Sequence, residues 1–125
     1  MKKILSFIFL VITALPVVAQ VSVEARIDSI EMFIGEQVHV TLTVTAGEQS
    51  NVAFPVFKPQ QMVTPGVEVL HSTATEKEPI DNGQAVYRQV YTLTSFDGKL
   101  YYLPPFAVKV DGKEYKSKSL ALKVI

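Results

Sequence analysis

Apolar and polar residues alternate with a period of two along most of the chain after residue 19. The clearest run covers residues 38–46, where one face is entirely apolar and the other carries His39 and three threonines. This period is that of side chains in a β-strand, and β-branched residues at nearly every position favour a strand over a helix. We therefore predict a strand with one buried face over residues 38–46.

The same alternation predicts further strands before and after this run. They cover residues 21–27, 30–34, 52–56 and 67–70. Pro55 and Pro59 place the strand at 52–56 at an edge or a bend, because proline cannot donate to a ladder. The polar stretch from Ser72 to Asp81 is predicted to be a loop or a frayed edge.

Asn-Gly and Asp-Gly pairs mark turns in the second half of the chain, because these residues tolerate a positive φ. The pairs are Asn82-Gly83, Asp97-Gly98 and Asp111-Gly112. The longest predicted strand runs over residues 84–96, and we assign its face with Tyr87, Tyr91 and Leu93 to the core. Pro104-Pro105 interrupts pairing before the last hairpin. Seven or eight short strands at this spacing predict an all-β, immunoglobulin-like β-sandwich.

The first segment differs from the rest in being almost continuously apolar. A basic start, Met1-Lys2-Lys3, precedes the apolar run, and small residues precede a cleavage position at Gln20, which is the layout of a secretory signal peptide. An uncleaved membrane anchor is the alternative, but a spanning helix needs about 20 apolar residues and Pro16 would break it. The 125-residue chain is thus expected to comprise a signal helix at 1–19 and one domain at 20–125.

Composition narrows the chemistry that the domain can perform. The chain has no cysteine and only two histidines, which disfavours thiolate chemistry and metal cages. His39 lies among threonines and is expected to be exposed without a ligand, and the neighbours His71 and Ser72 do not by themselves make a catalytic triad. The acidic loop at 76–81 lacks the ligand spacing of a calcium loop. We expect no catalytic residue, no cofactor and no metal.

Charge is distributed unevenly along the domain. Residues 20–98 carry four basic and ten acidic side chains, whereas residues 99–125 carry six lysines and two acids, a balance of +4. The sum of −2 over residues 20–125 disfavours a nucleic-acid binder. Two interpretations of the basic segment stay open. It is a docking surface for an acidic partner or an anionic membrane, or its lysines discourage edge-to-edge aggregation.

A candidate interaction surface combines these lysines with neighbouring tyrosines. Its residues are Tyr101, Tyr102, Lys109, Lys116 and Lys118. The tyrosines and Phe106 flank Pro104-Pro105, which is consistent with an aromatic recognition patch. The alternative is that one tyrosine holds a turn with its hydroxyl, as in other sandwiches.

Several segments, in their order and spacing, resemble the first extracytoplasmic domain of BatD, the oxygen-tolerance family. They are Gly35-Glu36, residues 66–69, Asn82-Gly83, residues 90–93, Gly98, residues 103–106, residues 108–113 and residues 115–117. The resemblance covers nearly all of residues 20–125. It implies a periplasmic, non-enzymatic protein connected with aerotolerance and envelope stress, encoded with MoxR-type ATPases and von Willebrand factor A-domain proteins. Family members typically continue to a C-terminal transmembrane helix, so a membrane link is expected only if the chain continues beyond Ile125.

The expected function is that of a protein-interaction module that acts on other envelope proteins and performs no chemistry. A carbohydrate-binding or adhesive surface domain is the alternative, and it would use exposed aromatics such as Tyr87, Tyr91 or Tyr102. A coplanar row of exposed tyrosines would support sugar stacking. Buried tyrosines would favour the interaction module.

Overall fold

The alternating run at residues 38–46 lies in β3 (Gln37–Gly47), which pairs antiparallel with β8 (Gln84–Thr94) along the full length of both strands. The computed structural model describes residues 20–125, so the predicted signal segment lies outside the described residues. The apolar face of β3 is completely buried, and so are Tyr87, Tyr91 and Leu93 of β8. The predicted core faces of both strands are therefore confirmed.

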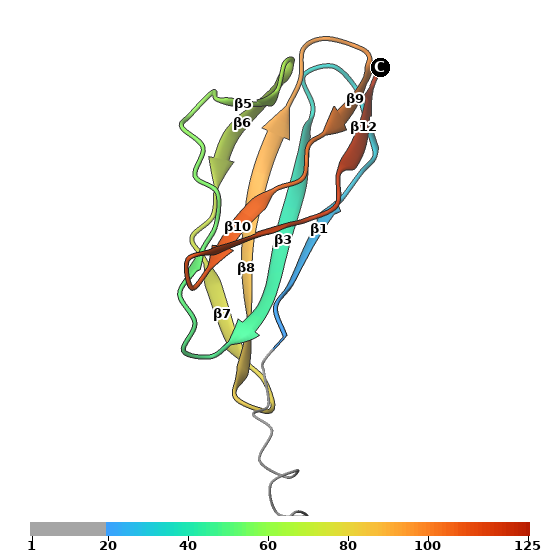
Figure 1. Cartoon of the computed structure of the whole chain (residues 1–125). Coiled ribbons are helices and arrows are strands. Elements are labelled where there is room, and N and C mark those ends of the chain that lie inside the picture. Colours follow the sequence, from blue (N-terminus) through green and yellow to red (C-terminus); the bar gives the residue numbers. More distant parts are fainter. Residues whose placement is uncertain (1–19) are drawn as a thin grey trace, which may run out of the picture.

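These two strands form the centre of the first sheet, in the order β1-β3-β8-β6-β5 (Figure 1). The flanking strands are β1 (Ser22–Ile27), β5 (Met62–Thr64) and β6 (Val67–Ser72). A further strand, β7 (Glu76–Pro79), pairs with the first half of β8, beyond the end of β6. The prediction of a loop over residues 72–81 is thus wrong for β7, whereas an edge position is confirmed, because β7 pairs with β8 alone. The four side chains of β7 are exposed, so β7 has no buried apolar face. Backbone pairing with β8 keeps it in the sheet.

The second layer is built from the last strands of the chain. They are β9 (Leu100–Leu103), β10 (Ala107–Val110), β11 (Lys113–Lys116) and β12 (Leu120–Val124). β9 pairs with β12 and β10 pairs with β11, so the four strands form one hairpin interrupted halfway. Pro104-Pro105 interrupts one arm, because proline cannot donate to the ladder. At the tip, Asp111 and Gly112 have φ of 51° and 82°, which confirms the predicted two-residue turn.

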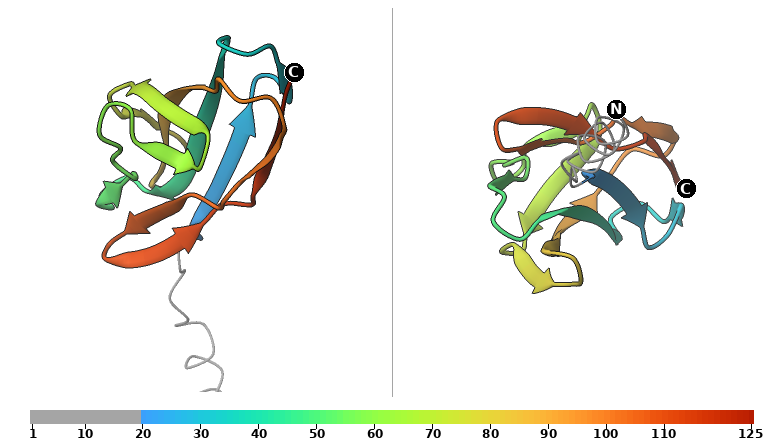
Figure 2. Two further views of the ribbon diagram at one scale, coloured as in Figure 1. Left: turned by 90° about the horizontal axis from the view of Figure 1, so that it is seen from above. Right: turned by 60° about the horizontal axis from the view of Figure 1, so that its bottom comes forward.

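Two short strands complete the second layer and connect it to the first. β4 (Val52–Ala53) pairs with β10, and β2 (Glu31–Met32) pairs parallel with β12. β1 and β2 follow each other in sequence but belong to different sheets, so the chain changes layer at residues 28–30. The predicted strand at 52–56 ends at Ala53, and Val56 is 86% exposed. Residues 20–125 thus form twelve short strands in a sandwich (Figure 2).

Aromatic rings hold the two layers together. Tyr91 and Phe106 are stacked with ring centres 6.2 Å apart, and Phe57 meets Tyr91 edge-on at 5.5 Å. The Tyr91 hydroxyl donates to the Pro55 carbonyl at 2.7 Å, and burial raises the pKa of Tyr91 well above its usual range. Such pairs stabilise a core beyond the area they bury. They connect β8 of the first sheet with the segments that flank β4 and β10.

Candidate interaction surfaces

Two lysines of the predicted interaction surface, Lys109 and Lys116, share the outer face of the second layer. Lys109 pairs with Glu114 and Ala107 pairs with Lys116 across β10 and β11, while Val108 points into the core. Lys109 and Lys116 are therefore diagonal neighbours, with Cα atoms about 7–8 Å apart. Both are exposed. The period of two thus places both lysines on one outer face of this half of the hairpin, together with the exposed Glu114. We call this the basic face.

Lys118 lies on a different part of the surface, because the hairpin loses its regular pairing at Ser117. The Ser117 hydroxyl is buried, accepts a hydrogen bond from the Phe106 N–H at 2.9 Å and donates to the Lys118 carbonyl at 3.0 Å. The exposed Lys118 lines a groove together with Val23, Glu24 and Ala25 of β1. The structure therefore brings Lys109 and Lys116 together and places Lys118 beside an acidic residue of the first sheet.

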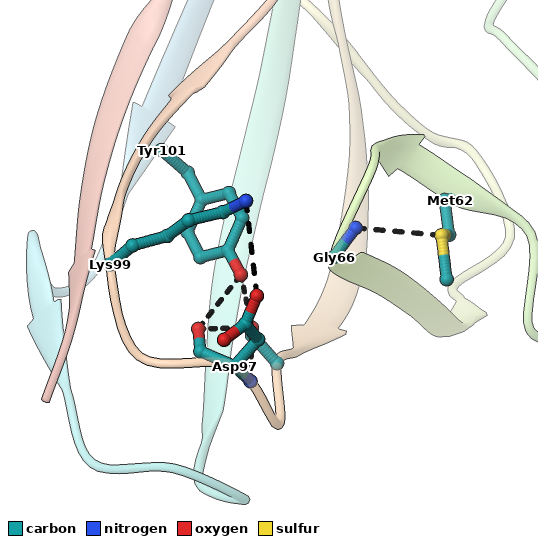
Figure 3. A network of polar contacts seen from close by, with 6 residues as sticks. Met62, Gly66, Asp97, Lys99 and Tyr101 are labelled. Carbon is teal, nitrogen blue, oxygen red and sulfur yellow. Dashed lines mark hydrogen bonds and ion pairs between the residues drawn. The ribbon is translucent and has the colours of Figure 1, made fainter.

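The two adjacent tyrosines of β9 have opposite roles. Tyr101 is buried, and its hydroxyl donates to the Asp97 carbonyl at 2.7 Å (Figure 3). A tyrosine that bonds back across the turn before its strand is the tyrosine corner of immunoglobulin-like domains, so the predicted turn role is confirmed for Tyr101. Its place in the interaction surface is corrected, because a buried ring offers no contact area. Tyr102 is 69% exposed and points outward.

The tyrosines proposed for sugar stacking do not form a surface row. Tyr87 and Tyr91 are buried, and the Tyr87 hydroxyl donates to the Gly47 carbonyl at 2.8 Å. Of the three tyrosines considered for that role, Tyr102 alone is exposed. One exposed ring gives no coplanar platform. The burial of the other two favours the interaction module.

The two histidines are both held by hydrogen bonds. The Asp28 carboxylate accepts from the His39 backbone N–H and contacts the His39 Nδ1 atom, each at 2.8 Å. Burial by itself would raise the pKa of Asp28, but the hydrogen bonds and charge interaction with His39 outweigh it, so the pKa lies below 3.8. His71 Nε2 lies 3.2 Å from the Thr92 hydroxyl. Within residues 20–125, no three His, Asp or Glu side chains gather as metal ligands would.

Sequence reasoning missed the Asp28–His39 pair and an exposed apolar surface at one end of the sandwich. Asp28 follows β1 and faces His39 across the ladder with β3, a proximity that only the strand register reveals. The apolar surface consists of Phe33, Ile34, Phe96, Leu100 and Ile125. Four of these residues lie outside the strands, where the period of two gives no information about orientation.

Two layers, of which the second consists of two three-stranded sheets, a chain that changes layer between β1 and β2, and the corner at Tyr101 define an immunoglobulin-like β-sandwich domain. The family model described as the BatD DUF11 like domain matches residues 25–124. The chain therefore belongs to the BatD family, as the resemblance of its turns and strands predicted. No curated protein matches the chain. In residues 20–125 the structure contains no helix long and apolar enough to cross a membrane.

Proposed function

We propose that this BatD-type domain is a non-enzymatic protein-interaction module on the extracytoplasmic side of a bacterial membrane. Membership of the BatD family supports the proposal, together with the signal-like segment at residues 1–19. In this role the domain docks onto other envelope proteins during aerotolerance or envelope stress. Its expected partners are the von Willebrand factor A-domain and MoxR-associated components that the family resemblance implies.

The observation that carries this proposal is the basic outer face of the second layer. Lys109 and Lys116 are diagonal neighbours on a regular β surface, with Glu114 opposite Lys109, in a segment with a balance of +4. Exposed Tyr102 stands farther along the outer face of the same layer. Charges of one sign at the rim of an interface steer a partner of opposite sign and raise the association rate. The partner surface is therefore acidic and presents an apolar contact to Tyr102.

The buried polar side chains support a structural rather than a chemical role for the interior. The hydroxyls of Tyr87, Tyr91 and Tyr101 each donate to a backbone carbonyl. Such bonds satisfy buried groups and fix turns. These hydroxyls are thus already used to hold loops against the sheets, which leaves the outer faces for contact with partners.

The test compares charge reversals at different positions. The double variant Lys109→Glu with Lys116→Glu changes the basic face, and the single variant Lys109→Glu changes one of its lysines. Lys58→Glu changes an exposed loop lysine elsewhere and is the control matched in charge to the single variant. The probe is the purified von Willebrand factor A-domain protein of the same organism, and association is followed by surface plasmon resonance at several salt concentrations. We expect the double variant to associate about tenfold more slowly or worse and to lose most of its salt dependence.

Each result of this comparison bears on the proposal. Equal loss in Lys58→Glu would mean that only net charge matters, and unchanged binding of the double variant would move the contact away from this face. Lys118→Glu is measured separately, because Lys118 lies in the groove beside β1. Saturable binding of the wild type to an envelope polysaccharide, without binding to the protein probe, would replace the proposal with the carbohydrate alternative.

A further inference from the structure

The first sheet ends at β1, whose second edge pairs with no other strand among residues 20–125 (Figure 1). We call this side the open edge of β1. The strand pairs with β3 over six consecutive residues without a shift in register, so its backbone is regular along its whole length. A regular free edge presents a row of N–H and C=O groups to which an extended chain can add as a further strand.

The other edge strands among residues 20–125 carry features that discourage such pairing. β7 has charged residues at three of its four positions and ends in Pro79, and β11 carries two lysines and a glutamate. β5 has three residues and shifts register against β6, and β9 is followed by Pro104-Pro105. β2 and β4 have two residues each. Prolines, lysines, bulges and short strands all protect an edge, and β1 has none of them.

The register with β3 shows which backbone groups of β1 are free. The Asp28 N–H donates to the His39 carbonyl at 3.0 Å, and in an antiparallel pair bonded positions alternate with non-bonded ones. Every second residue before Asp28 therefore bonds to β3. The residues between them direct their N–H and C=O groups toward the open edge, and they are Val23, Ala25 and Ile27. Within residues 20–125 these groups form no hydrogen bond.

A groove of about 330 Å³ lies beside β1. Val23, Glu24 and Ala25 of β1 line it together with Lys118, which belongs to the segment between β11 and β12 in the second layer. The side chains of Val23 and Ala25 are half-buried and pack against the core. Because side chains alternate along a strand, an added strand would direct every second side chain toward the groove.

The charged residues at the groove favour an acidic group in the added strand. Glu24 forms an ion pair with Arg26, whereas the Lys118 ammonium forms no ion pair with any of residues 20–125. Lys118 is therefore the unbalanced charge among the residues that line the groove. A carboxylate of the added strand would be complementary to it, and small apolar side chains would fit beside Val23.

We propose that the open edge of β1 binds an extended segment of another protein by β-augmentation, with an acidic residue of that segment facing Lys118. A segment of about six residues matches the length of β1, at about 3.3 Å per residue. Backbone hydrogen bonds supply the affinity in this mode, and side-chain pockets supply the specificity. The proposal goes beyond the proposed function, because it uses the first sheet rather than the basic face on β10 and β11.

The experiment titrates the isotope-labelled, exported full chain with the capped hexapeptide Thr-Val-Lys-Asp-Thr-Val and follows backbone amides by NMR. In an antiparallel arrangement, like every other pair of the first sheet, its two valines and its aspartate face the groove, with the aspartate opposite Ala25. We expect a dissociation constant on the order of 100 µM. Hydrogen exchange of Val23, Ala25 and Ile27, which is fast in the free chain, should slow by about tenfold at about 1 mM peptide.

Two modified peptides test the backbone contact itself. N-methylation of the peptide's aspartate removes the N–H that would donate to the Ala25 carbonyl, so the dissociation constant should rise by about tenfold or more. N-methylation of the preceding lysine is the matched control, because its N–H points away from β1. This second peptide should bind like the unmodified one.

Substitutions in the protein test the same contact from the other side. Lys118→Glu should weaken binding by about tenfold, and a peptide with lysine in place of aspartate should restore it. Lys58→Glu is the control with the same change of charge and should bind like the wild type. Ala25→Pro removes an N–H at the open edge without removing a bond to β3, so it should abolish binding. Circular dichroism melting checks that each variant folds, and if Ala25→Pro does not, the N-methylated peptides make the same test.

The outcomes separate this proposal from the proposed function. The basic-face variant Lys109→Glu with Lys116→Glu should bind the hexapeptide normally. Unchanged exchange of the three amides at about 1 mM peptide would overturn the proposal, and so would equal binding of the two N-methylated peptides. Peptide-induced shifts confined to β10 and β11 would overturn it too and place the contact on the basic face. Protection that grows with protein concentration in the absence of peptide would make a second copy of the chain the occupant instead.

Discussion

The pair β3 and β8 and the hairpin of β9 to β12 are both antiparallel, but they differ in continuity. β3 and β8 stay in register over eleven residues each, and every inward apolar side chain of β3 is buried. The hairpin is broken at Pro104-Pro105 and at Ser117, and its strands are four or five residues long. Both regions contribute buried side chains to the core, but the broken hairpin also displays Tyr102 and the two lysines of the basic face.

The largest effect is expected from a variant that makes a cavity in the core next to β3 and β8. Leu42 of β3 is fully buried opposite Gln89 of β8. Leu42→Ala should lower the free energy of unfolding by about 3 kcal/mol, because the lost contacts leave a cavity that rigid strands cannot close. Chemical denaturation measures the change, with Lys109→Ala on the hairpin as the control expected to stay within about 0.5 kcal/mol. Similar losses in both variants would contradict the division between core and display surface.

A second variant probes the place where the first sheet touches the hairpin. Gly66, between β5 and β6, has φ of +96°, and a Cβ there would lie 2.5 Å from the Tyr101 hydroxyl. Gly66→Ala combines backbone strain with this clash against the corner tyrosine, so we expect a loss of about 2–3 kcal/mol. Gly112→Ala is the matched control, since Gly112 has φ of +82° with open space around it. It should lose only about 1 kcal/mol from strain.

Thermal melting followed by circular dichroism compares these two glycine variants. If Gly66→Ala melts at the same temperature as Gly112→Ala, the contact between Tyr101 and Gly66 contributes nothing to holding the layers together. Tyr101→Phe then adds a sharper measurement, because it keeps the ring and removes the hydrogen bond to Asp97. Its expected cost is about 1 kcal/mol.

The sequence predicted the continuous region better than the broken one, for a physical reason. Alternation reports which face is buried only while a strand continues, as it does through β3 and β8. The alternation correctly predicted that the Lys109 side chain points outward, because β10 is a regular strand. It could not decide between Tyr101 and Tyr102, because one step of register exchanges buried and exposed positions. At Ile30 and Ile34 the alternation was misleading, because β2 contains only two residues and both isoleucines are exposed.

The smallest effect is expected where the chain leaves β1, at the exposed pair of Asp28 and His39. Burial would raise the pKa of Asp28, but its interactions with His39 bring the pKa below 3.8. A carboxyl group with a lowered pKa in the folded state stabilises the fold above its unfolded pKa. This stabilisation is lost as the pH falls from 3.8 through the folded value. Because both side chains are half-exposed, the contribution should be below about 1 kcal/mol.

Asp28→Asn removes this titration while keeping an oxygen that can accept the His39 N–H. The melting temperature of the variant should therefore lie slightly below that of the wild type at pH 5 and approach it as the pH falls below 3.8. Glu36→Gln is a suitable control, because the Glu36 carboxylate also accepts a backbone N–H, at 2.7 Å, at the other end of the same loop. A constant difference between wild type and Asp28→Asn at every pH would mean that Asp28 acts through its shape alone. The change of layer at residues 28–30 would then depend on the hydrogen bonds of Asp28 rather than on its charge.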